Sequence, residues 1–148
     1  MNLEHEGHFC TFFVHGLFFG VEVNRVQEVI RYQRLTRVPL TSSMIAGLMN
    51  LRGQIVTAID LRTRLGLPAR EGEDLPLNVV IRTSEGAMSL LVDQIGDVIE
   101  VDEGAFELPP QTLGGEAREL IRGAYKLEGR LLLVLDTARA LDLAEGAN

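Results

Sequence analysis

The chain has 148 residues, 46% of them hydrophobic, and a formal net charge of −7 at pH 7. This length suits one compact unit or two small subdomains, and the apolar fraction is sufficient for a hydrophobic core. The acidic balance disfavours a nonspecific polyanion partner such as DNA, because phosphate binding requires a basic surface. Cys10 is the only cysteine, which excludes an internal disulfide and a cysteine-rich metal site.

No run approaches the roughly 18 consecutive apolar residues of a membrane span. The N-terminus, MNLEHEGHF, lacks the charged and apolar regions of a secretory signal, so we expect a cytoplasmic protein. His5 and His8 have the i, i+3 spacing of helical metal ligands, but they lie in a polar terminus where disorder is the default. We therefore expect no bound metal.

The first strands are predicted near the N-terminus. Residues 9–14 and 18–23 are rich in aromatic and β-branched types and flank His15-Gly16, which predicts a β-hairpin. In the following stretch, NRVQEVI at 24–30, the apolar residues have helical spacing. We interpret this stretch as about one helical turn, with a bent strand as the alternative.

A loop and a capped turn are predicted next. Pro39 cannot donate to a sheet ladder and marks a loop or a sheet edge. The segment TSSMIAGLMNL at 41–51 is typical of an N-capped turn in which Thr41 or Ser42 accepts a backbone N–H and Gly47 ends the turn.

The stretch from Arg52 to Gly66 predicts a turn, a strand and a short helix. Arg52-Gly53 forms the tight turn, since Gly adopts a positive φ without steric cost. Residues 54–59 form the strand. Asp60 suits the N-cap of the helix, and Gly66 lies where a left-handed C-terminal cap is expected.

The chain contains an internal repeat. Residues 50–67 match 126–143 at an offset of 76, and residues 21–30 match 90–99 at an offset of 69. The change of offset means that the second copy has about seven extra residues, which we place in the Gly-containing loop at 111–119. The chain therefore contains two homologous halves, and the repeat constrains the fold.

The repeat and the local patterns predict the second half of the chain. Its expected elements are a hairpin of 77–82 and 88–92 turned at 84–86, a turn at Gly129, a strand at 131–135 and a helix cap at Asp136. A connector rich in Pro, Gly and charge at 67–76 marks the boundary between the halves. We therefore expect two small β-barrels of about five strands each, subdomain 9–67 and subdomain 77–143, around a shared apolar seam.

No constellation of residues indicates catalysis. GLMNLRG has glycines six apart but lacks the ending that a P-loop requires. Asp60 and Asp136 recur at matching positions, and paired carboxylates can perform acid–base chemistry. Helix capping explains both residues without any chemistry, and we favour that role. The expectation is a protein without enzymatic activity.

Polar residues break the repeat at one turn. Asn50 and Arg52 of the first copy correspond to Lys126 and Glu128 of the second, while the apolar frame and the glycine are kept. Arg52 with Glu28 is a candidate ion pair for a recognition surface. The alternative is an exposed arginine that is worth at most about 1 kcal/mol to stability. Spacing alone leaves both open.

Several stretches resemble one known family. These are FGVEVNRVQEVI, LTRVP, IAGLMNLRGQIVTAIDLRTRLGL, SLLVDQIGDVIEV and IRGAYKLEGRLLLVLD. Over roughly residues 9–143 they resemble the CheW family of chemotaxis coupling proteins, most specifically through the Asn-x-Arg-Gly turn, the apolar strand and Asp-Leu-Arg. The resemblance implies a mainly β fold of two SH3-like five-stranded barrels with short helices, and an adaptor without cofactor or enzymatic activity.

The resemblance also implies partners. Members of the family join the cytoplasmic tip of a methyl-accepting chemoreceptor to the regulatory domain of a CheA-type histidine kinase, in arrays to which they are recruited without membrane insertion. The positions that match the family's receptor site are Arg52, Asn50, Glu28, Val23 and Val26. Kinase contacts use the barrel ends, and Gly47 and Gly123 match glycines whose change disturbs coupling in the family.

Because the resemblance covers nearly the whole chain, we expect a stand-alone coupler with no receiver or kinase module. Arg31, Arg34 and Arg37 form a local basic stretch, which is either a solvated face or a partner contact.

A second class of function is a single-stranded nucleic-acid-binding or ligand-binding β-barrel. Nucleic-acid binding by such a barrel needs a basic groove with stacking aromatic residues. Aromatic residues make up 5% of the chain. Phe12, Phe13, Phe18 and Phe19 lie in a predicted strand pair, where the core is the favoured location.

Overall fold

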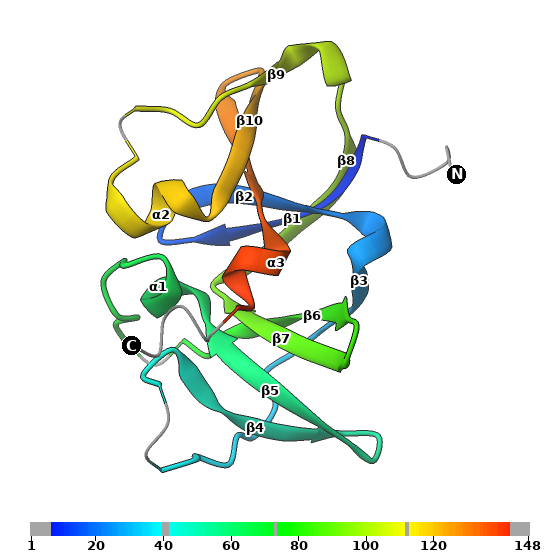
Figure 1. Ribbon diagram of the computed structural model, residues 1–148, viewed down its shortest axis with the longest axis vertical. Helices are drawn as coiled ribbons and strands as arrows, with labels where there is room; N and C mark the ends of the chain where they lie inside the picture. The colour runs from blue at the N-terminus through cyan, green and yellow to red at the C-terminus, as the bar shows by residue number, and fades with distance from the viewer. Residues whose placement is uncertain (1–6, 40–41, 73, 112, 143–148) are drawn as a thin grey trace.

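The computed structural model describes residues 7–39, 42–72, 74–111 and 113–142. The fold is mainly β, with two sheets and short helices (Figure 1). The strands are β1 (His8–Val14), β2 (Leu17–Glu22), β3 (Val26–Ile30), β4 (Ile45–Leu51), β5 (Gln54–Asp60), β6 (Leu77–Thr83), β7 (Gly86–Val92), β8 (Gln94–Glu100), β9 (Phe106–Glu107), β10 (Ile121–Leu127) and β11 (Arg130–Leu135). The helices are α1 (Leu61–Arg64), α2 (Gly115–Glu119), α3 (Thr137–Ala140) and the 3-10 turns η2 (Val23–Arg25) and η3 (Glu103–Ala105).

Each sheet takes strands from both halves of the chain. The first sheet has the order β8-β1-β2-β11-β10-β9, and the second has the order β3-β6-β7-β5-β4. The expected division into subdomain 9–67 and subdomain 77–143 is therefore wrong as a description of the two sheets. The physical reason is that the chain crosses between the sheets at η2, after the β1–β2 hairpin, and crosses back at Asp93, after the β6–β7 hairpin.

The internal repeat is confirmed by the strand register. β4 pairs with β5 and β10 with β11 in registers that are 76 residues apart, and each pair has a register shift before Gly47 or Gly123. The parallel pairs β11–β2 and β5–β7 also correspond, since Leu133 faces Phe19 and Thr57 faces Met88. The first five strands of the six-stranded sheet thus repeat the order of the second sheet, and β9 is the additional strand.

The extra residues of the second copy fall mostly where the sequence places them. Thr36 bridges Leu48 in the first copy, and Glu107 pairs with Ala124 in the second, so the offset is 71 at this point. It reaches 76 at Ile121, and the intervening segment includes α2. Two of the seven extra residues precede Glu107, and five follow it.

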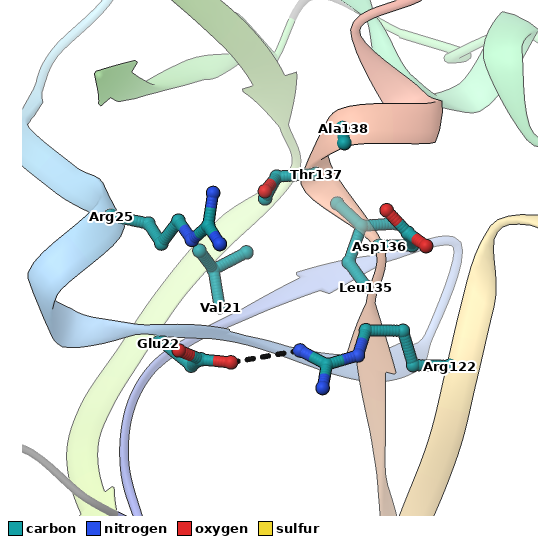
Figure 2. Close-up of a pocket in the computed structure, with 8 residues that line it drawn as sticks. All are labelled: Val21, Glu22, Arg25, Arg122, Leu135, Asp136, Thr137 and Ala138. Carbon is teal, nitrogen blue, oxygen red and sulfur yellow. Dashed lines mark hydrogen bonds and ion pairs between the residues drawn. The ribbon is translucent and has the colours of Figure 1, made fainter. Parts of the chain in front are cut away.

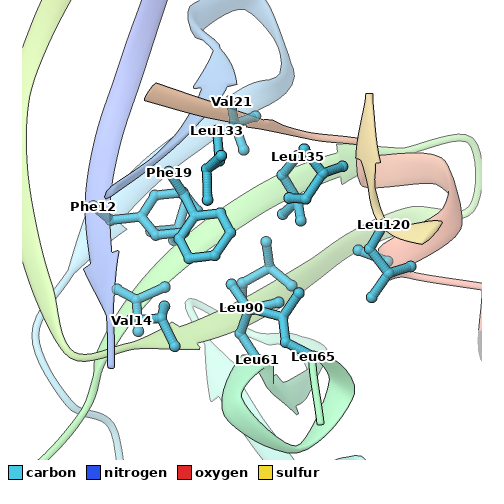
Figure 3. Close-up of a cluster of buried hydrophobic side chains, with 14 of the residues drawn as sticks. Phe12, Val14, Phe19, Val21, Leu61, Leu65, Leu90, Leu120, Leu133 and Leu135 are labelled. Atoms are coloured by element: carbon cyan, nitrogen blue, oxygen red, sulfur yellow. The ribbon is translucent and has the colours of Figure 1, made fainter. Parts of the chain in front are cut away.

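Buried apolar side chains form three clusters that explain how the two sheets hold together. The largest lies between the sheets, where residues of β1, β2 and β11 meet residues of β7 and α1 (Figure 3). A second cluster is formed mainly by side chains of the first sheet, and a third mainly by side chains of the second sheet. Two small interiors around a shared seam are what the sequence predicts.

The aromatic residues of the first hairpin belong to the core, as expected. Phe12 and Phe19 are fully buried and stack on each other, and Phe18 is 5% exposed. Phe13 is half-buried and packs against the cluster inside the first sheet. The rings of Phe12, Phe18 and Phe19 are therefore not available for stacking on nucleic-acid bases.

Two local expectations change. The stretch at 24–30 is chiefly a strand, with helical geometry only in η2, so the bent strand is the correct alternative. Residues 45–51 form strand β4, and Gly47 lies inside it rather than ending a turn. A short turn does precede the strand, since the Ser42 hydroxyl accepts a hydrogen bond from the backbone N–H of Met44 at 3.2 Å. Thr41 lies outside the described residues.

The two predicted helix caps are confirmed. The Asp60 carboxylate accepts a hydrogen bond from the backbone N–H of Arg62 at 3.0 Å, and Asp136 accepts one from the backbone N–H of Arg139 at 3.1 Å. Gly66 has a φ of 72° and donates to the Thr63 carbonyl, as expected of a left-handed C-terminal cap.

A buried arginine joins the two repeat-related helices α1 and α3. Arg64 is 7% exposed. Its Nε donates to the Ala140 carbonyl at 3.1 Å and its Nη2 to the Arg139 carbonyl at 2.7 Å. Carbonyls at the end of a helix lack intrahelical partners, so Arg64 completes the C-terminus of α3. In the part of the chain that the structure describes, no helix is long and apolar enough to cross a membrane.

Candidate partner-binding site

The β4–β5 turn is held in an unusual backbone conformation. Arg52 has a φ of 51° and Gly53 a φ of 86°, and positive values at both positions define a type I′ turn. An arginine adopts this region only at a cost, because its Cβ crowds the backbone. The Asn50 side chain supports the turn, since its Oδ1 accepts a hydrogen bond from the backbone N–H of Gly53 at 2.9 Å.

Arg52 forms the ion pair with Glu28 that the sequence suggests. The Nη2 of Arg52 donates to the Oε2 of Glu28, which joins the β4–β5 turn to β3. The Arg52 side chain is 65% exposed and the Glu28 side chain 22%. Gln27 also donates to the same Glu28 oxygen at 3.1 Å. The sequence did not single out Gln27, although its position beside Glu28 was a signal.

The charges of this pair shift both pKa values. The hydrogen bond from Arg52, followed by that from Gln27, lowers the pKa of Glu28 below its usual value. The hydrogen bond to Glu28 raises the pKa of Arg52. Both side chains are therefore charged at neutral pH, and together they present a fixed cation beside a fixed anion.

The apolar residues expected beside this pair are placed differently. Val26 is 9% exposed and belongs to the cluster between the sheets, so its side chain does not line a groove on the surface. Val23 is half-buried in η2. The exposed apolar residue nearest the turn in the strand pairing is Ile55, which lies opposite Asn50 and is 66% exposed. Strand alternation could have found it, since its neighbour Val56 points inward.

The two glycines expected at the kinase contacts are buried packing positions. A Cβ on Gly47 would lie 2.8 Å from the Thr36 carbonyl oxygen, and a Cβ on Gly123 would lie 2.5 Å from that of Glu107. Both glycines let a neighbouring segment cross close to the strand. Any effect of substituting these glycines on kinase binding must therefore act through the position of that segment. The kinase contact itself stays a prediction.

The basic stretch lies on the surface. Arg31, Arg34 and Arg37 are all exposed, and none forms an ion pair with the residues that the structure describes. This arrangement fits a solvated face as well as a partner contact, so the partner contact stays a prediction.

A polar pocket of about 230 Å³ lies between the end of β2 and the start of α3 (Figure 2). Glu22 and Arg122 form an ion pair at 2.8 Å along its wall, and Arg25 approaches from η2. Its Asp136 carboxylate already caps α3. Its lining has no histidine or cysteine, and among the described residues no group of three possible ligands could hold a metal ion.

Known proteins are similar to this chain in sequence and in fold. The chain matches the CheW-like domain family over residues 8–145. It is 34% identical over 132 residues to the chemotaxis protein CheW of Bacillus subtilis (strain 168), covering 89% of this chain and 85% of that protein. It is 28% identical over 129 residues to the chemotaxis protein CheW of Klebsiella aerogenes, covering 87% of this chain and 78% of that protein.

Among solved structures, the scaffolding protein CheW of Thermoanaerobacter tengcongensis superposes with a TM-score of 0.77 at 26% identity, covering 87% of this chain and 88% of that one. This likeness confirms the mainly β architecture. Together with the family match over nearly the whole length, it shows that the chain belongs to the CheW-like family of non-enzymatic chemotaxis scaffold proteins.

Proposed function

We propose that this protein is cytoplasmic and couples the cytoplasmic tip of a methyl-accepting chemoreceptor to the regulatory domain of a CheA-type histidine kinase, in membrane-associated or cytoplasmic chemoreceptor arrays. The observation that carries the proposal is the Arg52–Glu28 pair, which a hydrogen-bonded turn holds at the surface. The receptor site consists of Arg52, Glu28 and the exposed Ile55, supported by Asn50 and Val23.

The energetics of the pair favour recognition over stability. An ion pair exposed to solvent contributes little to folding, because water screens the charges. Truncating a charge at an interface costs more when its partner is left buried and unpaired. Arg52 is paired with Glu28 yet mostly exposed, so covering the pair with a partner increases its contribution.

The kinase contact is proposed at the edge of the first sheet. Phe106 of β9 and Leu108 after it are 43% and 81% exposed, which gives this edge an apolar surface. Gly123 lies beneath Phe106, so it positions the same surface from below. An apolar centre is what stable protein interfaces generally have.

Calorimetric titration of the purified protein with a receptor-tip hairpin and, separately, with a kinase regulatory domain tests the proposal. Arg52→Ala and Glu28→Ala should each weaken receptor binding by roughly tenfold or more and leave kinase binding and the melting temperature unchanged. Leu108→Asp should weaken kinase binding alone.

Arg122→Ala is the matched control, since Arg122 and Glu22 form another exposed Arg–Glu pair, at 2.8 Å. It should leave receptor binding intact. Receptor affinities of Arg52→Ala and Glu28→Ala that stay within about twofold of the wild type would show that the pair is not the receptor site.

A further inference from the structure

We infer that Asn50 is a positioning residue of this site: its side chain fixes the turn conformation that directs Arg52 toward Glu28, and it acts through Arg52 rather than by touching the receptor. This inference rests on the proposed function for its effect on receptor binding. Its structural part, the control of the turn by Asn50, stands independently.

The geometry of the turn gives Asn50 this role. Asn50 lies two residues before Arg52, and its Oδ1 accepts a hydrogen bond from the backbone N–H of Gly53 at 2.9 Å. The bond therefore closes over Arg52 and ties down the peptide between Arg52 and Gly53. Type I′ turns strongly favour Asn or Asp at the position that Arg52 occupies. Arginine there needs support from elsewhere, and Asn50 provides it.

The repeat-related hairpin of the molecule lacks such an acceptor. The β10–β11 hairpin repeats the β4–β5 hairpin in the same register and also has a two-residue turn, Glu128-Gly129. Lys126 replaces Asn50 there and carries no acceptor for a backbone N–H. Gly129 has a φ of 82°, but Glu128 does not have a positive φ. The same frame thus adopts a different turn where the side-chain acceptor is missing.

The β1–β2 turn has the same kind of side-chain support. Among the described residues, His15 is the other non-glycine residue with a positive φ, at 50°. A side-chain oxygen supports it as well, since Asp93 Oδ2 accepts a hydrogen bond from the backbone N–H of His15 at 2.7 Å. In both turns where a residue with a Cβ takes the left-handed conformation, a side-chain carbonyl or carboxylate oxygen binds a backbone N–H of the turn.

The conformation of the turn determines the direction of the Arg52 side chain. The Arg52 side chain is 65% exposed, so little packing holds its guanidinium beside Glu28. Its direction therefore depends on the backbone of the turn. Without the acceptor on residue 50, the turn can relax to the conformation of the β10–β11 turn and the guanidinium leaves Glu28. Receptor binding is then lost although residues 52 and 28 are unchanged.

Three substitutions separate this role from others. Asn50→Ala removes the acceptor, Asn50→Gln keeps an amide but moves it one methylene further out, and Asn50→Asp keeps a short oxygen acceptor. Nuclear magnetic resonance of each variant should report the φ of Arg52 and the titration of the Glu28 carboxylate. Calorimetry with the receptor-tip hairpin should report affinity, and a thermal melt should report stability.

In Asn50→Ala and Asn50→Gln, Arg52 should leave the left-handed region and the pKa of Glu28 should rise toward its usual value. Receptor affinity should fall by the same factor as in Arg52→Ala, with a melting temperature close to that of the wild type. Asn50→Asp should keep the turn, the lowered pKa of Glu28 and the affinity. The double variant Asn50→Ala/Arg52→Ala should bind no more weakly than Arg52→Ala, because both changes remove one interaction.

Two results would overturn the inference. One is a left-handed Arg52 and a lowered Glu28 pKa that persist in Asn50→Ala. The other is a further loss of affinity in the double variant, which would mean that Asn50 touches the receptor directly. If the wild type does not bind the receptor hairpin at all, the proposed function fails, while the resonance measurements still decide whether Asn50 controls the turn.

Discussion

Arg62 and Asp93 form a bidentate ion pair that joins helix α1 to the segment between β7 and β8. Nε of Arg62 donates to Oδ1 of Asp93 at 3.0 Å, and Nη2 donates to Oδ2 at 2.6 Å. Arg70 of the connector also donates to Oδ1, at 2.7 Å, and the His15 backbone N–H to Oδ2. One carboxylate therefore ties a helix, a hairpin turn and the connector to the point where the chain crosses between the sheets.

The Asp93 cluster predicts a dependence of stability on acid pH. Burial raises the pKa of Asp93, but the hydrogen bonds from Arg62, His15 and Arg70 outweigh it and lower the pKa from 3.8 to about 2. The folded-state pKa lies below the unfolded one, so the stabilisation is complete above about pH 4 and is lost as the pH falls toward about 2. Solvent screening of this partly exposed carboxylate reduces its contribution to roughly 1–2 kcal/mol.

Urea melts of the wild type and Asp93→Asn at several pH values between 2 and 7 measure this contribution. The variant should be less stable at neutral pH, and the difference should shrink at the acid end. Asp97→Asn is the control, since the Asp97 side chain is exposed and forms no hydrogen bond or ion pair with the described residues. A difference between wild type and Asp93→Asn that is constant with pH would contradict the prediction.

The helix caps predict a modest and symmetric loss of stability. Asp60→Ala and Asp136→Ala each remove the acceptor of one helix N–H, so each should lower the free energy of unfolding by roughly 0.5–2 kcal/mol. Partner binding of the folded variants should persist. Asp60→Asn and Asp136→Asn keep an acceptor and should recover most of the loss in the same urea melts. An unchanged midpoint for both alanine variants would remove the capping assignment.

The buried glycines predict steric destabilisation. Gly47→Ala and Gly123→Ala should each lower stability by roughly 1–3 kcal/mol, because the added methyl group meets a backbone carbonyl of the crossing segment. Gly104→Ala is the control, since a Cβ there makes only an ordinary contact at 3.4 Å. Thermal melts should rank Gly104→Ala close to the wild type and both other variants well below it. Equal melting temperatures for all three variants would show that the crossing segments shift to accommodate the methyl group without a loss of stability.

The candidate site was predictable from sequence only in part. The residue types and the broken repeat pointed to Arg52 and Glu28, and the structure pairs them. The orientation of Val26 was not predictable, because a register shift between Val26 and Glu28 interrupts the alternation of β3 and turns Val26 toward the core. The supporting role of Asn50 depends on the turn type, which the motif alone does not specify.

The fold, too, was predictable from the sequence only in part. Matching segments revealed the repeat, the hairpins and the caps, because these depend on local patterns. Which strands share a sheet depends on where the chain crosses, and the crossings at η2 and Asp93 have no strong sequence signal. The Pro- and Gly-rich connector at 67–76 suggested a boundary between two subdomains, yet it joins α1 to β6 within a single intertwined unit.

The exchange of strands predicts that neither half of the chain folds alone. A break after Gly72 separates β1 to β5 from β6 to β11. In the N-terminal fragment, β3 loses its neighbour β6 and the β4–β5 hairpin loses β7. In the C-terminal fragment, β8 loses β1 and β11 loses β2. Each fragment keeps only separate hairpins or short ladders, which are marginally stable in water.

Fragments 1–72 and 73–148, prepared separately, should each lack a cooperative thermal transition and dispersed amide resonances. Mixed in equal amounts, they should recover both, because the β1–β2 hairpin completes the first sheet and the β6–β7 hairpin completes the second. Asp93 and Arg62 lie on different fragments, so Asp93→Asn in the C-terminal fragment should weaken the reassembled complex. A cooperative transition in either fragment alone would mean that a half can build its own sheet, contrary to the observed strand order.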